Sequence, residues 1–216
     1  MKGCGPLFLY YLSPKYCCVK YLLLPLFLLS ICISGVGQSS YKDSILSFQD
    51  AYKKDMYTII QDDTAFVRFY PIDPFYRVTA KVELLIHEKF FPMATSGGIT
   101  KQAIKYVLLT FNYSGKEYKL YGYQLGFLLN STDHKDDFFI PFTDAGSGTG
   151  SYGGGRYIDF VVSDITPGKT LAIDFNKAYN PYCAFKPGYT CPIPPKENNL
   201  PFEMRAGEMN FGKSKH

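Results

Sequence analysis

In the part of the chain that follows residue 37, the spacing of hydrophobic and polar positions changes once, from the period of a helix to the period of a strand. Between residues 39 and 56, apolar side chains recur every three or four positions, which is the spacing of one helix face. That face contains Tyr41, Ile45, Phe48, Tyr52 and Met56. From residue 77 onward the spacing becomes two, as in strands that turn one face toward a core. The pattern therefore predicts one amphipathic helix followed by a β-rich region.

The strands predicted beyond this helix are short. They are expected at 77–88, at 106–123 as a hairpin around Ser114–Gly115, and at 137–142, 156–162 and 170–176. In the first of them the core-facing positions would be Val78, Ala80, Val82, Leu84 and Ile86. From residue 180 proline and glycine dominate, and regular structure is expected to fade. Short strands after a single helix favour a mainly β fold, an antiparallel sandwich or a partly open barrel.

The first 37 residues have the composition of an export signal. They contain Lys2, Lys15 and Lys20, a proline-interrupted apolar run at 21–37, and small residues near its end. This combination is typical of a cleaved signal peptide, and the run is short for a transmembrane helix. We therefore expect a signal peptide at 1–37, a single domain at 38–216 with no stable membrane span, and a periplasmic or extracellular location. The alternative is an uncleaved N-terminal segment that anchors the chain.

Loss of this segment would change the charge and the cysteine count. All 19 acidic residues follow it, while three of the 23 basic residues lie within it, so the mature chain would be nearly neutral. A clustered basic face for nucleic acid is therefore not expected. Cys183 and Cys191 would remain, and two cysteines in an exported chain favour a disulfide over two buried thiols. No metal site is expected, because structural zinc needs four ligands at closer spacing.

Three consecutive glycines, Gly153, Gly154 and Gly155, precede Arg156 in the stretch SYGGGRYIDF. The preceding glycines complete a dinucleotide-like G-x-G-x-x-G pattern, but a strand follows where that motif needs a helix, so no cofactor is expected. The glycines predict either a tight turn or a loop whose free N–H groups hold an anion. Arg156 would then either bind a carboxylate or phosphate, or tie the turn to the C-terminal segment through an internal acid. The acids considered are Asp144, Asp174 and Glu208.

The segment from 173 to 208 is rich in tyrosine, asparagine and acidic residues. Asparagine side chains satisfy the backbone of irregular segments, whereas aromatic rings beside amides and carboxylates also suit sugars. Both interpretations remain open at this point. The candidate ligand-binding residues of the two regions together are Asp144, Tyr152, Gly153, Gly154, Gly155, Arg156, Asp174, Asn176, Tyr179, Asn180, Glu197, Asn198 and Glu208.

Several motifs of the chain are specific when they are taken together. They are FIPFTDAGSGTGSYGGGRYID (139–159), DFNKAYNPYCAF (174–185), CPIPPKENNLP (191–201) and AGE (206–208), with FYPIDPFYRV (69–78) and MATSGG (93–98). In these motifs the chain resembles a bacterial family known as domain of unknown function 1684. Gly146 departs from the pattern, since a hydroxyl residue is expected there. The resemblance implies a shared fold and an uncharacterised role, and it brings no activity with it.

Three classes of function remain open from the sequence. The domain could bind a small polar ligand, a sugar or an anion, between the glycine stretch and the C-terminal segment. It could instead be a hydrolase-like enzyme that uses paired carboxylates as acid and base. The third class is a structural or interaction protein of the cell envelope. The histidines are expected to be solvated surface groups, and the oligomeric state is not predicted.

Overall fold

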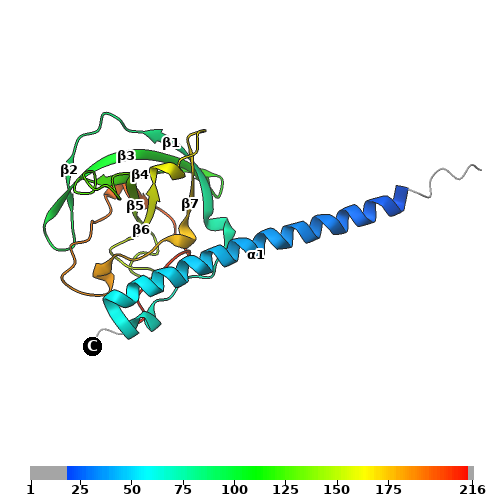
Figure 1. Cartoon of the computed structure of the whole chain (residues 1–216), viewed down its shortest axis with the longest axis horizontal. Coiled ribbons are helices and arrows are strands. Elements are labelled where there is room, and N and C mark those ends of the chain that lie inside the picture. The colour runs from blue at the N-terminus through cyan, green and yellow to red at the C-terminus, as the bar shows by residue number, and fades with distance from the viewer. Residues whose placement is uncertain (1–18, 214–216) are drawn as a thin grey trace, which may run out of the picture. The chain divides into compact units, whose positions relative to one another are not determined.

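The computed structural model describes residues 19–213 of the chain (Figure 1). Two compact units divide the chain, one ending at Asp43 and the other beginning at Ser44. Helix α1, Val19–Ile60, is the single α-helix of the described part and contains the helix predicted at 39–56. The predicted signal segment begins outside the described residues. Within residues 19–213, no helix is both long enough and apolar enough to cross a membrane.

The amphipathic face predicted for this helix is confirmed in its C-terminal half. Ile45 and Met56 are each 1% exposed, and Phe48 and Tyr52 between them are half-buried. Met56 packs with Ile60 at the end of α1. The apolar spacing therefore reports a true packing face, although α1 starts well before the predicted segment.

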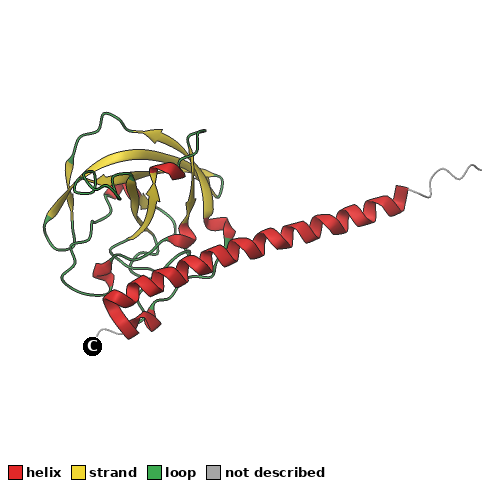
Figure 2. Cartoon of the chain, viewed as in Figure 1, coloured by secondary structure: helices red, strands yellow, loops and turns green. Residues whose placement is uncertain are grey.

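The unit that begins at Ser44 is mainly β, and its antiparallel sheet curls into a half barrel (Figure 2). This confirms the predicted fold class. The strands are β1 Arg77–Leu84, β2 Phe91–Ala94, β3 Thr100–Tyr113, β4 Lys116–Leu125, β5 Asp137–Asp144, β6 Arg156–Val161, β7 Thr170–Asp174 and β8 Asn199–Leu200. Their order is β6-β5-β4-β3-β1-β7, with β2 added to β3 and the short β8 added in parallel to β5.

Short 3₁₀ helices occupy several of the connections. They are η1 Gln61–Phe66, η2 Pro74–Tyr76, η3 Val162–Asp164, η4 Phe175–Lys177, η5 Tyr182–Ala184 and η6 Lys196–Asn198. The last three lie in the C-terminal segment, which is otherwise irregular as predicted. That segment nevertheless follows a defined path, because Tyr179 bridges to Tyr157 of β6 and β8 pairs with β5.

Each predicted strand has an observed counterpart, but two strands were not predicted and several ends differ: β3 begins at Thr100 rather than at residue 106, and β7 ends at Asp174 rather than at residue 176. The hairpin turn lies at Ser114 and Gly115, both with positive φ, between β3 and β4. Strands β2 and β8 were not predicted, because each is too short to show a period. The strand predicted at 77–88 was too long: β1 ends at Leu84, and Ile86 beyond it is 78% exposed.

The sheet carries apolar residues on both faces, which is what creates the candidate site. Side chains such as Phe142 of β5 and Leu109 of β3 belong to the main core, which Leu200 and Met204 of the C-terminal segment also join. On the opposite face, Tyr123 of β4 and Phe139 of β5 form a second cluster. Both sides of the half barrel therefore depend on residues that come late in the chain.

Candidate functional site

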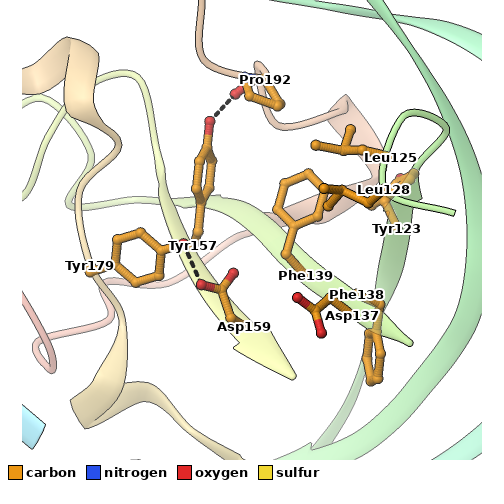
Figure 3. Close-up of a pocket in the computed structure, with 10 residues that line it drawn as sticks. All are labelled: Tyr123, Leu125, Leu128, Asp137, Phe138, Phe139, Tyr157, Asp159, Tyr179 and Pro192. Carbon is orange, nitrogen blue, oxygen red and sulfur yellow. Dashed lines mark hydrogen bonds between the residues drawn. The ribbon is translucent and has the colours of Figure 1, made fainter. Parts of the chain in front are cut away.

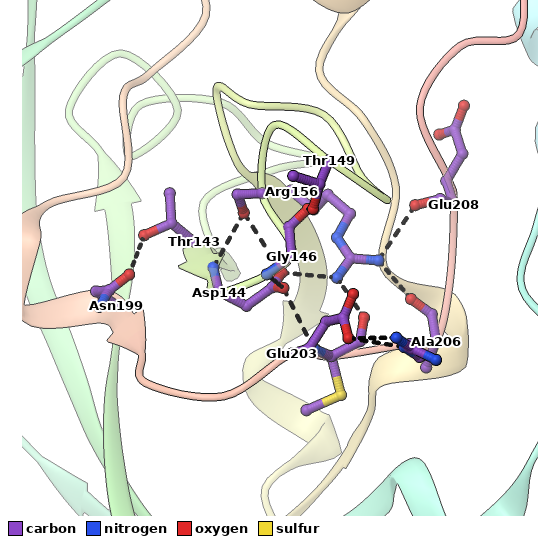
Figure 4. A network of polar contacts seen from close by, with 12 residues as sticks. Thr143, Asp144, Gly146, Thr149, Arg156, Asn199, Glu203, Ala206 and Glu208 are labelled. Carbon is purple, nitrogen blue, oxygen red and sulfur yellow. Dashed lines mark hydrogen bonds and ion pairs between the residues drawn. The ribbon is translucent and has the colours of Figure 1, made fainter.

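Arg156 lies at the start of β6, and its guanidinium group is completely buried (Figure 4). Its Nη2 donates to Asp144 Oδ2 at 2.9 Å and to the carbonyl of Met204 at 2.8 Å. Its Nη1 donates to the carbonyls of Ala206 and Glu208. The arginine therefore ties the glycine stretch to the C-terminal segment, and these donors are taken by the protein.

The glycine stretch is also largely satisfied from within. Gly150 donates its N–H to Gly146 O at 3.0 Å, and Gly148 donates to Ser151 O at 2.9 Å. Gly155 donates to Tyr152 O at 3.1 Å. An anion held by these amides would have to displace bonds that are already made. The arrangement is that of a structural turn.

Gly155 shows why glycine is needed at the end of this turn. Its φ of +87° is a conformation that other residues adopt with strain. A Cβ atom there would lie 2.6 Å from Phe142 O, which is far inside contact distance. Gly153 has neither restriction, and it is exposed.

The asparagines predicted as ligand contacts act as clamps between segments. Asn198 is fully buried, donates to the carbonyls of Tyr121 and Pro141, and accepts from Tyr121 N at 2.8 Å. Asn176 donates to Asp73 O at 2.9 Å and to Asp174 Oδ1 at 3.0 Å. These side chains satisfy backbone groups of irregular or curved chain, as the first of the two sequence interpretations proposed.

Glu208 and Asn180 form a further buried connection, which also reaches helix α1. Glu208 Oε2 accepts from Asn180 N at 2.8 Å and from the Tyr52 hydroxyl at 2.9 Å. Asn180 Nδ2 donates to Met209 O at 2.8 Å. Burial raises the pKa of Glu208 to about 7, even though these donors and Arg156 favour its ionised form.

The two cysteines are adjacent but are not joined in the structure. Both are free thiols, and Cys183 N donates to Cys191 Sγ at 3.3 Å. The hydroxyl of Tyr152 lies 3.7 Å from Cys183 Sγ. The predicted bridge is therefore not formed here, although the chain brings the two sulfur-bearing residues together. Burial raises the pKa of Cys191 to about 11, so this thiol stays protonated near neutral pH.

Of the predicted contacts, Tyr179 is the one that lines a described pocket, which has a volume of about 250 Å³ (Figure 3). The pocket lies on the second face of the sheet, between strands β4 to β6 and the C-terminal segment. Its aromatic wall is made by the rings of Tyr123, Phe139, Tyr157 and Tyr179, and Leu125, Leu128 and Pro192 complete the apolar lining. Phe138 borders the pocket, but its ring packs in the main core on the opposite face of the sheet. Two carboxylates, Asp137 and Asp159, also line it.

Strand register brings these pocket residues together. Phe139 of β5 pairs with Tyr123 of β4 on one side and with Asp159 of β6 on the other. Asp137 lies two residues before Phe139 on β5 and so shares its face of the sheet. Tyr179 is added by its backbone bridge to Tyr157.

The two carboxylates of the pocket have different surroundings. Asp159 Oδ2 accepts from the Tyr179 hydroxyl at 2.6 Å. The residue is exposed to solvent, but desolvation by its surroundings raises the pKa of the carboxyl despite that bond. Asp137 Oδ2 lies 2.8 Å from His134 Nδ1, at the exposed rim. The expectation of a purely solvated His134 is thus incomplete, since this imidazole pairs with a pocket residue.

Most of the residues that line this pocket were not predicted from the sequence. Asp137 and Asp159 lie in separate predicted strands, and only the register makes them neighbours on one face. The alternation of side chains along the strand predicted at 156–162 could have indicated part of the pocket. Tyr157 and Asp159 lie on one face of that strand, and Ile158 lies on the face that packs in the main core. Glu197, a predicted contact, instead pairs with Lys105 at 3.0 Å and accepts from the Tyr123 hydroxyl.

Comparisons with known proteins agree with this fold and assign no activity. A family model described as a protein of unknown function (DUF1684) matches residues 43–209. No curated protein matches the chain. Among solved structures, the solution NMR structure of an uncharacterized protein from Haloarcula marismortui is similar, with a TM-score of 0.62 and 26% identity. That match covers 80% of this chain and 96% of the other.

Proposed function

The chain belongs to the DUF1684 family, and from this premise we propose that it is an exported protein that binds a small polar ligand of the sugar class. The proposed site is the aromatic pocket between β4 to β6 and the C-terminal segment. The observation that carries the proposal is the composition of its wall, in which aromatic rings and two carboxylates line one pocket. Rings cover the apolar C–H faces of a sugar, while carboxylates accept from its hydroxyl groups.

The pocket favours a sugar over an anion, the other ligand class considered from the sequence. Two carboxylates in the lining would repel an anion bound in the pocket, whereas each can accept hydrogen bonds from the hydroxyl groups of a sugar. The guanidinium of Arg156, which would have been the anion-binding group, is directed into the protein. The volume of about 250 Å³ suits one small ligand.

A ligand screen tests this proposal directly. We expect monosaccharides to raise the melting temperature of the mature protein and to produce saturable heat in isothermal titration calorimetry. Phe139→Leu removes part of the pocket wall and should weaken binding, whereas Phe142→Leu changes the other face of the same strand and should leave affinity unchanged in the folded protein. The absence of sugar binding by the folded protein would refute the proposal.

Export has a separate test. The basic, apolar and small-residue pattern of residues 1–37 supports cleavage after Gly37. We expect the mature protein to begin at Gln38 in N-terminal sequencing and to be recovered from the periplasmic or extracellular fraction. Recovery of the full-length chain with the membrane fraction would instead support the anchored alternative.

Hydrolysis is the second candidate function, and one observation favours it. Asp137 and Asp159 line one pocket in different surroundings, and the pKa of Asp159 is raised, as a general acid requires. If the protein is a glycosidase, it should release nitrophenol from chromogenic glycosides, and Asp159→Asn should abolish that release. Saturable sugar binding without hydrolysis of the glycosides would support the binding function and exclude the hydrolase function.

A further inference from the structure

The hydrogen-bonding groups that the pocket leaves for a ligand are acceptors. The Tyr123 hydroxyl donates to Glu197 at 3.2 Å, and the Tyr157 hydroxyl donates to Pro192 O. The Tyr179 hydroxyl donates to Asp159. The three tyrosine hydroxyl groups of the wall thus donate their hydrogen bonds to acceptors of the protein. The carboxylates of Asp137 and Asp159 can still accept hydrogen bonds from a ligand. A complementary ligand must supply the donors.

The pocket also carries unbalanced negative charge. Asp159 forms no ion pair with a cation among residues 19–213, and its one described hydrogen bond comes from the neutral Tyr179. Asp137 pairs with His134, whose side chain is 59% exposed and which is charged only when protonated. A nearby lysine, Lys101, lines the adjacent pocket and lies over the Phe127 ring instead. A cation inside the pocket would therefore meet an uncompensated carboxylate.

The aromatic wall adds to the attraction for a cation. The rings of Phe139 and Tyr157 meet edge to face with their centroids 5.4 Å apart, and Tyr157 meets Tyr179 in the same way at 5.9 Å. Aromatic ring faces are negative in their electrostatic potential and attract ammonium groups. Asp159 is directly opposite Phe139 in the sheet register, so the carboxylate and the rings border one space.

We propose that the ligand of this pocket carries a protonated amine, as an amino sugar does, and that Asp159 selects it. This inference rests on the proposed sugar-binding function and narrows its ligand class. The bond from Tyr179 holds the Asp159 carboxylate in place, which reduces the conformational freedom that binding would otherwise have to remove. Asp137 contributes a second negative charge at the rim.

Three closely related probes separate the contribution of the amine from that of the sugar ring. Glucosamine carries the cation, glucose carries a hydroxyl group in its place, and N-acetylglucosamine keeps the nitrogen without the charge. In calorimetric titrations of the mature protein at pH 7 and low salt, we expect glucosamine to bind at least about tenfold more tightly than the other two. Added salt should weaken glucosamine binding more than glucose binding.

Substitution of the pocket carboxylate tests its role. Asp159→Asn keeps the volume and an acceptor for Tyr179, and it should reduce the advantage of glucosamine to less than about threefold. Asp136→Asn is the matched control, because Asp136 is exposed in the turn before β5, next to the pocket residue Asp137, but does not itself line the pocket. This control should retain the full advantage.

The outcomes separate the two proposals. Equal affinity of the wild-type protein for glucosamine and glucose, with no difference in salt dependence, would overturn the amine inference while leaving sugar binding in place. Failure of all three probes to bind would overturn the sugar-binding function and the inference with it. If Asp159→Asn does not fold, the salt dependence of the wild-type protein decides the question.

Discussion

Arg156 and Asp144 form an ion pair of 2.9 Å in which neither side chain reaches solvent, their exposed fractions being 0% and 1%. One charge comes from the start of β6 and the other from the end of β5. The pair is completed by backbone carbonyls of the C-terminal segment and by the amides of Gly146 and Met204, which donate to Asp144 Oδ1. These hydrogen bonds to both Nη atoms and to the carboxylate are what make a buried pair tolerable, although Arg156 Nε is buried without a partner.

Removal of one partner should therefore be costly. Arg156→Ala leaves a buried carboxylate and several carbonyls unpaired, and we expect it to lower the free energy of unfolding by about 3–5 kcal/mol. Arg205→Ala breaks an exposed pair with Glu203 and should have little effect. Urea unfolding followed by circular dichroism measures both changes. Near-equal stabilities of the two variants would show that the buried network does not hold the fold.

Glu208 predicts a dependence of stability on pH. Its folded-state pKa is raised to about 7 from an ordinary value of 4.5, so the folded protein favours the protonated form. The stabilisation is complete below about pH 4.5 and is lost as the pH rises through 7, by roughly 3 kcal/mol. Unfolding free energies measured from pH 4.5 to 8 should show this decline in the wild-type protein.

Two variants isolate that carboxyl from other titrating groups. Glu208→Gln cannot ionise and should lose this part of the decline. Tyr52→Phe removes a hydroxyl group that donates to the carboxylate, so it should move the titration to higher pH. A decline of the same size in Glu208→Gln would assign the effect to a different group.

The run of three glycines should respond unequally to substitution. Gly155→Ala imposes a positive φ on alanine and places its Cβ against Phe142 O, and we expect a loss of more than about 2 kcal/mol. Gly153→Ala adds a methyl group at ordinary contact distance on the exposed part of the turn, so it should change stability by less than about 1 kcal/mol. Thermal unfolding compares the two. A larger loss for Gly153→Ala would mean that the exposed tip has a role beyond the turn.

Cys191 should be slow to react with alkylating agents, yet the two cysteines should be able to form a bridge. Because burial raises the pKa of Cys191 from 9.0 to about 11, its thiolate fraction near neutral pH falls about a hundredfold, and alkylation by iodoacetamide should slow accordingly. Given a thiol oxidant, we expect Cys183 and Cys191 to join and the free energy of unfolding to rise by up to about 2.5 kcal/mol. Intact mass with and without reduction detects the bridge. Both thiols remaining free after prolonged oxidation would contradict the predicted pairing.

The parts of the fold that the sequence predicted are those set by local spacing. The face of α1 that contains Ile45 and Met56, and the turn at Ser114–Gly115, follow from neighbouring residues alone. The two-residue strand β8 could not be predicted in this way, because its pairing with β5 depends on tertiary contacts. The end of β1 was misplaced for a similar reason: an alternating pattern continues to Ile86, but the pairing stops at Leu84.

The candidate site was harder to predict than the fold. The polar residues of the C-terminal segment were good candidates for ligand contacts by composition. The side-chain amides of Asn176 and Asn198, however, donate to backbone carbonyls of the protein. Asp159 was not among the candidates from the sequence, and its place in the pocket depends on Tyr179, which bridges to Tyr157 and donates to this carboxylate. Composition identified the segment that matters, but the strand register decided which carboxylates share a pocket.

The carbonyls that accept from Arg156 belong to Met204, Ala206 and Glu208, which follow it in the chain by 48, 50 and 52 residues. During synthesis from the N-terminus, strand β6 is made well before these acceptors exist. A chain interrupted before them would have to bury an arginine most of whose N–H donors lack acceptors, so the folded state becomes favourable only once residues 204–208 have been made. Closure of the fold around the guanidinium group is therefore a late event in synthesis, set by the arrival of this segment.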